Sequence, residues 1–118
     1  MKQSQRSKRV AELFKAELAS MLLREIKDPR VQGLVTIMRV EIGSDLRLAR
    51  VFVGIYGDEK KKKQAMDGLK SAKGYIRSLI SKRIYLRRCP EIEFRLDESF
   101  DAQQRITQLL YDARNKVN

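Results

Sequence analysis

The chain has 118 residues, the length of one small domain, and its 42% of hydrophobic residues supplies a single core rather than a disordered tail. It carries a net charge of +11, no histidine and one cysteine, Cys89, which excludes an internal disulfide and argues against His-dependent catalysis or an ordinary zinc site. No apolar run reaches the roughly 20 residues of a membrane helix and no signal segment follows the basic N-terminus. We therefore expect a cytoplasmic protein that is not an enzyme and needs no cofactor or metal.

The first predicted element is an amphipathic helix over residues 6–27. Ser4 or Ser7 is placed to cap its start. Pro29 disfavours the helical conformation of Asp28, so the helix is expected to end there. Its apolar side chains recur at steps of three and four residues, which places on one helical face Val10, Leu13, Phe14, Leu18, Met21, Leu22 and Ile26.

Two strands are predicted next, over residues 34–42 and 48–56. Both are rich in β-branched residues, which favour strands. The turn-forming segment Gly43-Ser44-Asp45-Leu46 separates them. The two strands are therefore predicted to form an antiparallel hairpin.

A long helical region is predicted over residues 59–85 and must end before Pro90. One face, within about 100° of helical arc, is apolar and consists of Ala65, Leu69, Ala72, Ile76, Leu79 and Ile80. A largely opposed face is basic and consists of Lys63, Lys70, Lys73 and Arg77. Gly74 lies beside the basic face, so one side of the region is expected to pack while the other presents charge.

The last predicted elements are a short strand and a helix. Apolar and charged residues alternate over residues 91–96, which is typical of a half-buried strand. A final helix is predicted over residues 101–114, with an apolar face made of Ile106, Leu109 and Leu110. Residues 115–118 are expected to be a frayed end.

The order of these elements predicts the α+β class. A right-handed crossover would place the third strand parallel to the second, giving a three-stranded mixed sheet covered on one face by helices. No internal repeat or linker divides the sequence. We expect a single domain over residues 1–118, with its core at about residues 6–110 and flexible termini.

The positive charge is concentrated in one part of the chain. Residues 60–88 contain eleven basic residues and one acidic residue, Asp67. This concentration favours a polyanionic partner, and RNA, DNA and an acidic membrane surface all fit at this level. The alternative is a solvated lysine face without a ligand.

The element order resembles a type II KH domain, an RNA-binding module. KH domains clamp the nucleic-acid backbone with a GxxG loop between two helices. The corresponding segment here reads Ser71-Ala72-Lys73-Gly74, so the GxxG sequence is absent. The departure puts an ordinary KH clamp in doubt.

Several segments, in order, resemble the bacterial ribosome-binding factor A family over about residues 6–110. They include Arg9-Val10, "DPR" at 28–30, "VTIMRVEIGSDLRLARVFV" at 35–53, "LKSAKGYIRSLI" at 69–80, "RCPEIEF" at 88–94, "DES" at 97–99 and "RI..LL" at 105–110. That family replaces GxxG with an Ala-x-Gly sequence in a helix-kink-helix, which Ala72-Lys73-Gly74 matches. The expected fold is therefore a type II KH-like domain of order α-β-β-α(kink)α-β plus a C-terminal helix.

The resemblance also implies a function. It implies a non-enzymatic assembly factor that binds free or immature 30S ribosomal subunits through 16S rRNA and assists late maturation, including processing of the precursor 5′ end, with an association to growth in the cold. The implied partners are the 5′-terminal region of 16S rRNA, ribosomal proteins and other assembly factors. We expect a monomer without a membrane partner.

The predicted RNA-binding residues follow the basic face and extend beyond it. They are Lys70, Lys73, Gly74, Arg77, Lys82, Arg83, Arg87 and Arg88, with Arg6 and Arg9 near the N-terminus. Ala72 and Gly74 would form the kink, because a glycine lets the backbone bend and lets a phosphate strand approach closely. The alternative for Gly74 is that it only tolerates a packing constraint.

Other interpretations stay open at this point. Arg30, Arg47, Arg50 and the lysines at 60–63 are either RNA contacts or local and solvated side chains. The second class of function is a general basic nucleic-acid-binding protein without ribosome specificity. A nuclease is a third class, which the absence of histidine and of an acidic metal cluster disfavours.

Overall fold

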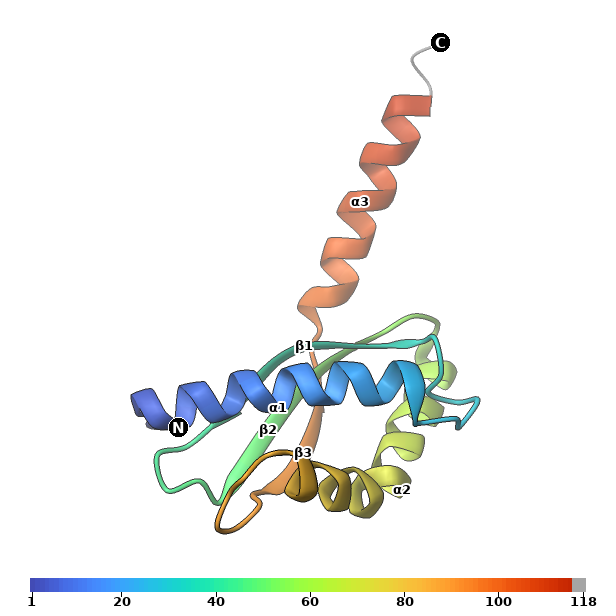
Figure 1. The fold of residues 1–118 in the computed structure, drawn as a ribbon. Coiled ribbons are helices and arrows are strands. Elements are labelled where there is room, and N and C mark those ends of the chain that lie inside the picture. The colour runs from blue at the N-terminus through green and yellow to red at the C-terminus, as the bar shows by residue number, and fades with distance from the viewer. Residues whose placement is uncertain (116–118) are drawn as a thin grey trace.

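The computed structural model describes residues 1–115, and these form three helices and one three-stranded sheet (Figure 1). In the sheet, the strand order is β1-β2-β3, with β1 antiparallel and β3 parallel to the central β2. The predicted α+β class and the mixed sheet are therefore confirmed. The elements are α1 (Gln5–Arg24), β1 (Val35–Ile42), β2 (Leu48–Ile55), α2 (Glu59–Arg83), β3 (Glu91–Leu96) and α3 (Ser99–Asn115).

Helix α1 begins with a capping box. The Ser4 hydroxyl accepts a hydrogen bond from the Ser7 backbone amide, and the Ser7 hydroxyl accepts one from the Ser4 amide, which satisfies two donors that a helix start leaves free. The helix ends at Arg24, one turn earlier than predicted. The amide of Ile26 donates to the carbonyl of Met21, five residues back, so the chain leaves the helix before it reaches Pro29.

The hairpin has the predicted turn and a bulge that the sequence did not reveal. The Leu46 amide donates to the Gly43 carbonyl at 2.9 Å, which closes the turn. The register between β1 and β2 shifts between Ile37 and Arg39, so the sheet accommodates one extra residue on β1.

Helix α2 is one uninterrupted helix rather than two helices separated by a break. Its N-cap is Asp58, whose side chain accepts a hydrogen bond from the Lys61 amide at 2.9 Å, and the helix ends two residues earlier than predicted. Figure 1 shows the ribbon changing direction along its length, from the yellow-green part to the gold part. The predicted kinked pair is therefore a single bent helix.

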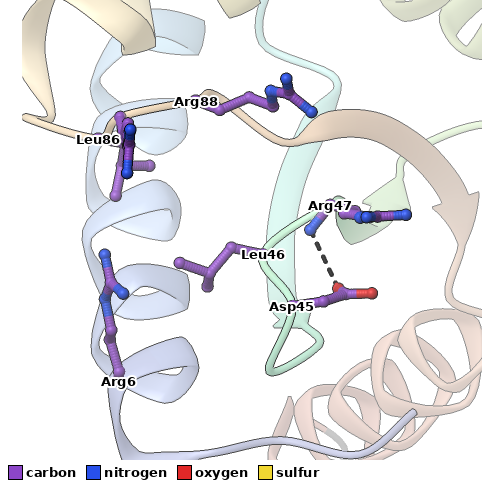
Figure 2. A pocket seen from close by; sticks show the side chains of 7 residues that line it. Arg6, Asp45, Leu46, Arg47, Leu86 and Arg88 are labelled. Atoms are coloured by element: carbon purple, nitrogen blue, oxygen red, sulfur yellow. Dashed lines mark hydrogen bonds between the residues drawn. The ribbon is translucent and has the colours of Figure 1, made fainter.

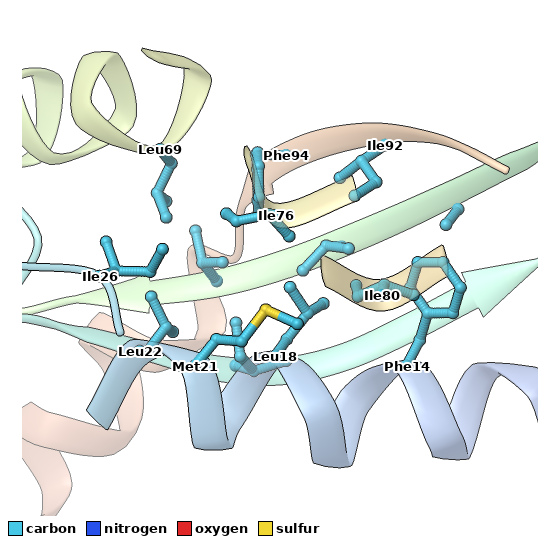
Figure 3. Close-up of a cluster of buried hydrophobic side chains, with 14 of the residues drawn as sticks. Phe14, Leu18, Met21, Leu22, Ile26, Leu69, Ile76, Ile80, Ile92 and Phe94 are labelled. Carbon is cyan, nitrogen blue, oxygen red and sulfur yellow. The ribbon is translucent and has the colours of Figure 1, made fainter. Parts of the chain in front are cut away.

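The core lies between the sheet and the helices α1 and α2. Alternate β2 residues, Ala49, Val51, Val53 and Ile55, are almost fully buried, as the two-residue period of a strand requires. Figure 3 shows the helix side chains gathered over the strands, with Phe14, Leu18 and Met21 from α1 and Leu69, Ile76 and Ile80 from α2. These residues fall on the predicted apolar faces of both helices.

Helix α3 projects away from the rest of the molecule (Figure 1). Only Phe100 is buried, where it packs against Gly54 and meets the Tyr56 ring edge-on, with 5.0 Å between ring centroids. The predicted apolar face is present but exposed: 59% of Ile106, and 68% of Leu109 and of Leu110, remain accessible. The helix reaches Asn115, where fraying was predicted, and residues 116–118 lie outside the described part of the chain.

Candidate nucleic-acid interface

Three segments that are far apart in the sequence enclose a pocket of about 480 Å³. Its walls come from the start of α1, the turn between β1 and β2, and the loop between α2 and β3 (Figure 2). We call it the arginine pocket and define it by its lining residues, Arg6, Asp45, Leu46, Arg47, Leu86, Arg87 and Arg88. Three of the predicted RNA-binding residues therefore meet here, together with Arg47, whose role the sequence left open.

Backbone hydrogen bonds hold the three segments together. The carbonyl of Lys2 accepts a hydrogen bond from the Ser44 amide at 2.9 Å, which ties the N-terminal segment to the hairpin turn. The Glu91 amide donates to the Arg47 carbonyl at 2.9 Å, which ties the start of β3 to the start of β2. The pocket is thus fixed by the sheet ladder and not only by side chains.

The floor of the pocket has an apolar part. Leu46 and Leu86 line it and also pack against the hydrophobic core. Leu46 has φ of +57°, a left-handed conformation that side chains other than glycine adopt at a cost. Its side chain is partly buried against the core, and β2 begins two residues later, after Arg47.

The arginines of the pocket have no acidic partners within residues 1–115. Ion pairs engage Arg30, Arg39, Arg50, Arg77, Arg83 and Arg95. Over the same residues, no ion pair involves a pocket arginine. The one carboxylate in the lining, Asp45, accepts a hydrogen bond from the Arg47 backbone amide at 3.1 Å. Four positive charges therefore face one negative charge in a concave site.

Arg77, predicted to contact RNA, is engaged in holding the neighbouring loop. Its guanidinium donates to the carbonyls of Cys89 at 2.8 Å and Pro90 at 3.2 Å, and it lies 3.1 Å from a Glu91 carboxylate oxygen. These contacts fix the loop that carries Arg87 and Arg88. Burial raises the pKa of the Cys89 thiol, so this cysteine stays protonated beside Arg77.

Arg83 is likewise engaged between two helices. Its guanidinium pairs with Glu25 and lies 3.4 Å from a Glu17 carboxylate oxygen. The Glu25 hydrogen bond is the main reason that the pKa of Arg83 is raised. Arg83 therefore clamps the end of α2 to α1, and its charge is offset locally.

The remaining predicted residues of α2 have no such partners within residues 1–115. Lys70 and Lys82 are exposed and Lys73 is half-buried, and no ion pair engages them. Gly74 is exposed, and a Cβ built there would have no atom within 4 Å beyond its own helix. Within residues 1–115, packing therefore does not require a glycine at position 74. Gly74 lines a shallow hollow with Arg77, Ser78, Ser81 and Cys89.

The N-terminal arginines separate in space. Arg6 lines the arginine pocket, whereas Arg9 lines a different shallow hollow on α1 with Lys8, Glu12 and Leu13. The half-exposed Leu13 was predicted to face the core. The predicted basic residues at the chain start therefore do not form one contact surface.

Two basic residues have roles that the sequence did not indicate. Lys62, within a run predicted as solvated or RNA-facing, is buried and pairs with Asp101, which raises its pKa and links α2 to α3. Arg47 joins the pocket because Leu48 pairs with Glu91 in the parallel register. The predicted parallel pairing of the second and third strands was the signal that could have placed Arg47 here. Such pairing brings the start of β2 beside the loop before β3.

Neither a metal site nor a membrane helix is found in the described part of the chain. Within residues 1–115, no three histidine, cysteine, aspartate or glutamate side chains gather in a way that could hold a metal ion. No helix in the same range is both long and apolar enough to cross a membrane.

The fold and this surface define a small KH-like α+β protein with a basic, concave site. The sequence profile of the family described as Ribosome-binding factor A matches residues 6–110. The chain belongs to that family, whose members are non-enzymatic ribosome assembly factors. The predicted family and the prediction that the chain is not an enzyme are thereby confirmed.

Individual relatives agree with this assignment. The chain is 49% identical over 106 residues to a ribosome-binding factor A of Halothermothrix orenii, which covers 90% of this chain and 86% of the relative. The crystal structure of ribosome-binding factor A from Thermus thermophilus superimposes with a TM-score of 0.68, covering 76% of this chain and 93% of the other at 24% identity. This second likeness supports the fold.

A further match is to the same Thermus thermophilus factor placed in a ribosomal complex. A homology model of this factor, fitted into a cryo-EM map of its complex with the 30S subunit, matches with a TM-score of 0.62 at 25% identity. The match covers 75% of this chain and 91% of the other.

Proposed function

We propose that this chain binds free or immature 30S subunits through 16S rRNA and assists late maturation of the small subunit, including processing of the precursor 5′ end. Membership of the family and the 30S complex of a relative support this proposal. The single observation that carries it is the arginine pocket, whose four guanidinium groups have no carboxylate partner within residues 1–115. The protein would act as a cytoplasmic monomer on the 5′-terminal region of 16S rRNA, beside ribosomal proteins and other assembly factors.

The proposed mechanism is positioning by charge. Contacts from lysine and arginine to phosphates supply affinity and orientation without reading the base sequence. Recognition of the right site would then depend on the shape of the immature rRNA. Binding should weaken as salt rises, because each phosphate contact releases bound counterions.

The bent helix would contribute the second part of the surface. Within residues 1–115 no ion pair engages Lys70 or Lys73 beside Gly74, and the missing Cβ leaves room for a phosphate strand to approach the backbone. Lys82 extends the same surface toward the loop. Arg77 and Arg83 would act mainly by fixing the loop and the end of α2, because their charges are already paired.

The test is a binding assay on small subunits that accumulate when the protein is absent. We expect the purified chain to cosediment with these immature subunits at physiological salt, even with excess DNA present. Cells without the protein should accumulate 16S rRNA with an unprocessed 5′ end. A double variant, Lys70→Gln with Lys73→Gln, should bind more weakly and process less of this precursor.

A general nucleic-acid-binding role would give a different result. In that case DNA and immature subunits would compete equally for the protein, and loss of the protein would leave the precursor 5′ end correctly processed. That outcome would contradict the proposed function.

A further inference from the structure

We propose that the arginine pocket is a binding site for RNA backbone phosphates, and that it supplies the phosphodiester grip that the absent GxxG loop would otherwise provide. This inference rests on the proposed function. The ligand class is a short stretch of phosphodiester backbone, with one negative charge for each phosphate.

The charge balance of the pocket favours this ligand. Four guanidinium groups and the Asp45 carboxylate leave an excess of three positive charges around a pocket of about 480 Å³. Repulsion among these groups is relieved only by an anion or by counterions. Arginine also suits phosphate, because its planar group can donate two parallel hydrogen bonds to two oxygens.

The pocket is held in place before any ligand arrives. The N-terminal segment is bonded to the turn through Lys2 and Ser44, and β3 is bonded to the start of β2 through Glu91 and Arg47. Arg77 holds the loop from behind through the Cys89 and Pro90 carbonyls. Because the backbone is already ordered, binding costs mainly the freedom of four exposed side chains.

The shape of the pocket adds a second property. Leu46 and Leu86 provide apolar surface between the charged groups, and both are anchored in the core. Figure 2 shows Leu46 pointing toward α1, across the space that Arg6 also faces. A sugar can lie on this apolar part while its flanking phosphates contact the arginines. The pocket is thus suited to a backbone strand more than to an isolated ion.

The experiment compares two double variants that lose the same charge. The pocket variant carries Arg47→Gln and Arg88→Gln. The control carries Arg39→Gln and Arg95→Gln. Both control arginines are ion-paired and lie on the face of the sheet that α1 and α2 leave uncovered. We expect the pocket variant to bind immature 30S subunits at least roughly tenfold more weakly. Its slope of log affinity against log salt should fall by roughly two, one for each lost phosphate contact. The control should stay within about twofold of the wild type.

A third variant should have the opposite effect. Asp45→Asn removes the one negative charge of the pocket while its amide oxygen can still accept the Arg47 amide hydrogen bond. We expect this variant to bind subunits more tightly than the wild type, most clearly at low salt.

The outcomes separate this inference from the proposed function. If the wild type binds immature subunits but the pocket and control variants lose affinity equally, or neither loses any, the pocket is not the phosphate site and the inference is overturned. If the wild type does not bind these subunits, the proposed function fails. In that case a short single-stranded oligoribonucleotide replaces the subunit as the probe, and equal binding by the pocket and control variants overturns the inference.

Discussion

The open face of the sheet, which α1 and α2 leave uncovered and which carries Arg39, Arg50 and Arg95, is rich in arginine, as is the arginine pocket. The two surfaces nevertheless use their arginines differently. On the open face, Arg39 lies over the Phe52 ring and within 3.3 Å of Asp97, while Arg50 and Arg95 both contact Glu93. Around the pocket, no ion pair engages an arginine within residues 1–115. Carboxylates on or directly after its own strands neutralise the open face, whereas within residues 1–115 the pocket keeps an excess of positive charge.

The difference shows that the number of basic residues in a segment does not locate a binding surface. Residues 60–88 carry eleven basic residues, but Lys62, Arg77 and Arg83 are engaged inside the fold. Arg6 and Arg47 lie outside this segment and still join the pocket. Pairing, rather than density, distinguishes charges that hold the fold from charges free for a partner.

The two glycines of α2 allow the same comparison between a residue that holds the fold and one that faces a partner. Substitution of the first has the largest expected effect on stability. A Cβ at Gly68 would lie 2.7 Å from Cγ2 of Val31, whereas at Gly74 it would meet open space. Gly68→Ala should therefore lower the free energy of unfolding by about 1–3 kcal/mol through overpacking. Urea denaturation measures this change, and an unaltered midpoint would show that the loop at Val31 yields without cost.

Gly74→Ala should separate folding from binding. Alanine is a better helix former, so the free energy of unfolding should rise by up to about 1 kcal/mol if the bend tolerates the substitution. Affinity for immature subunits should nevertheless fall, because the Cβ occupies the surface that a phosphate strand would approach. Urea denaturation and cosedimentation of the same preparation give both values, and undiminished binding would contradict a role for this surface.

Arg83→Gln should affect stability, and Arg88→Gln should not. Removal of Arg83 breaks its pairs with Glu17 and Glu25, and since these groups are partly exposed, the loss of stability should be small, well below that of Gly68→Ala. Arg88 has no pair to lose within residues 1–115. Thermal unfolding of the two variants, each with one charge removed, makes the comparison; equal melting temperatures would weaken the distinction between paired and free arginines.

The smallest expected effect is a pH dependence of stability at the open face of the sheet. The hydrogen bond from Arg95 lowers the pKa of Glu93 from its ordinary value, and the hydrogen bond from the Ser99 hydroxyl lowers the pKa of Asp97 in the same way. Because both pKa values are lower in the folded chain, their stabilising contribution is present above about pH 4–5 and is lost as the pH falls through the folded values. Glu93→Gln should therefore reduce the acid sensitivity of unfolding, measured by urea denaturation from neutral to acidic pH, and an unchanged pH profile would contradict this.

Local patterns in the sequence predicted most of the fold and part of the site. Periodicity placed both packing helices and the strands, and the crossover rule gave the parallel pairing of β2 and β3. The bulge at Ile37 depends on the pairing of β1 with β2, which periodicity does not contain. Periodicity likewise does not specify the hydrogen bond from Ile26 to Met21 that ends α1 early, or the direction in which α3 leaves the molecule. For the same reason, charge alone could not reveal that Arg77 binds loop carbonyls or that Arg47 joins Arg88.

Cryo-EM of this chain on precursor-containing small subunits would test the central claim most directly. We predict that the arginine pocket and the Lys70–Gly74 surface of α2 lie against the 16S rRNA backbone, while the neutralised open face of the sheet points away from it. A complex in which the open face or α3 alone contacts the RNA, with the arginine pocket open to solvent, would contradict the claim that unpaired charge marks the binding surface.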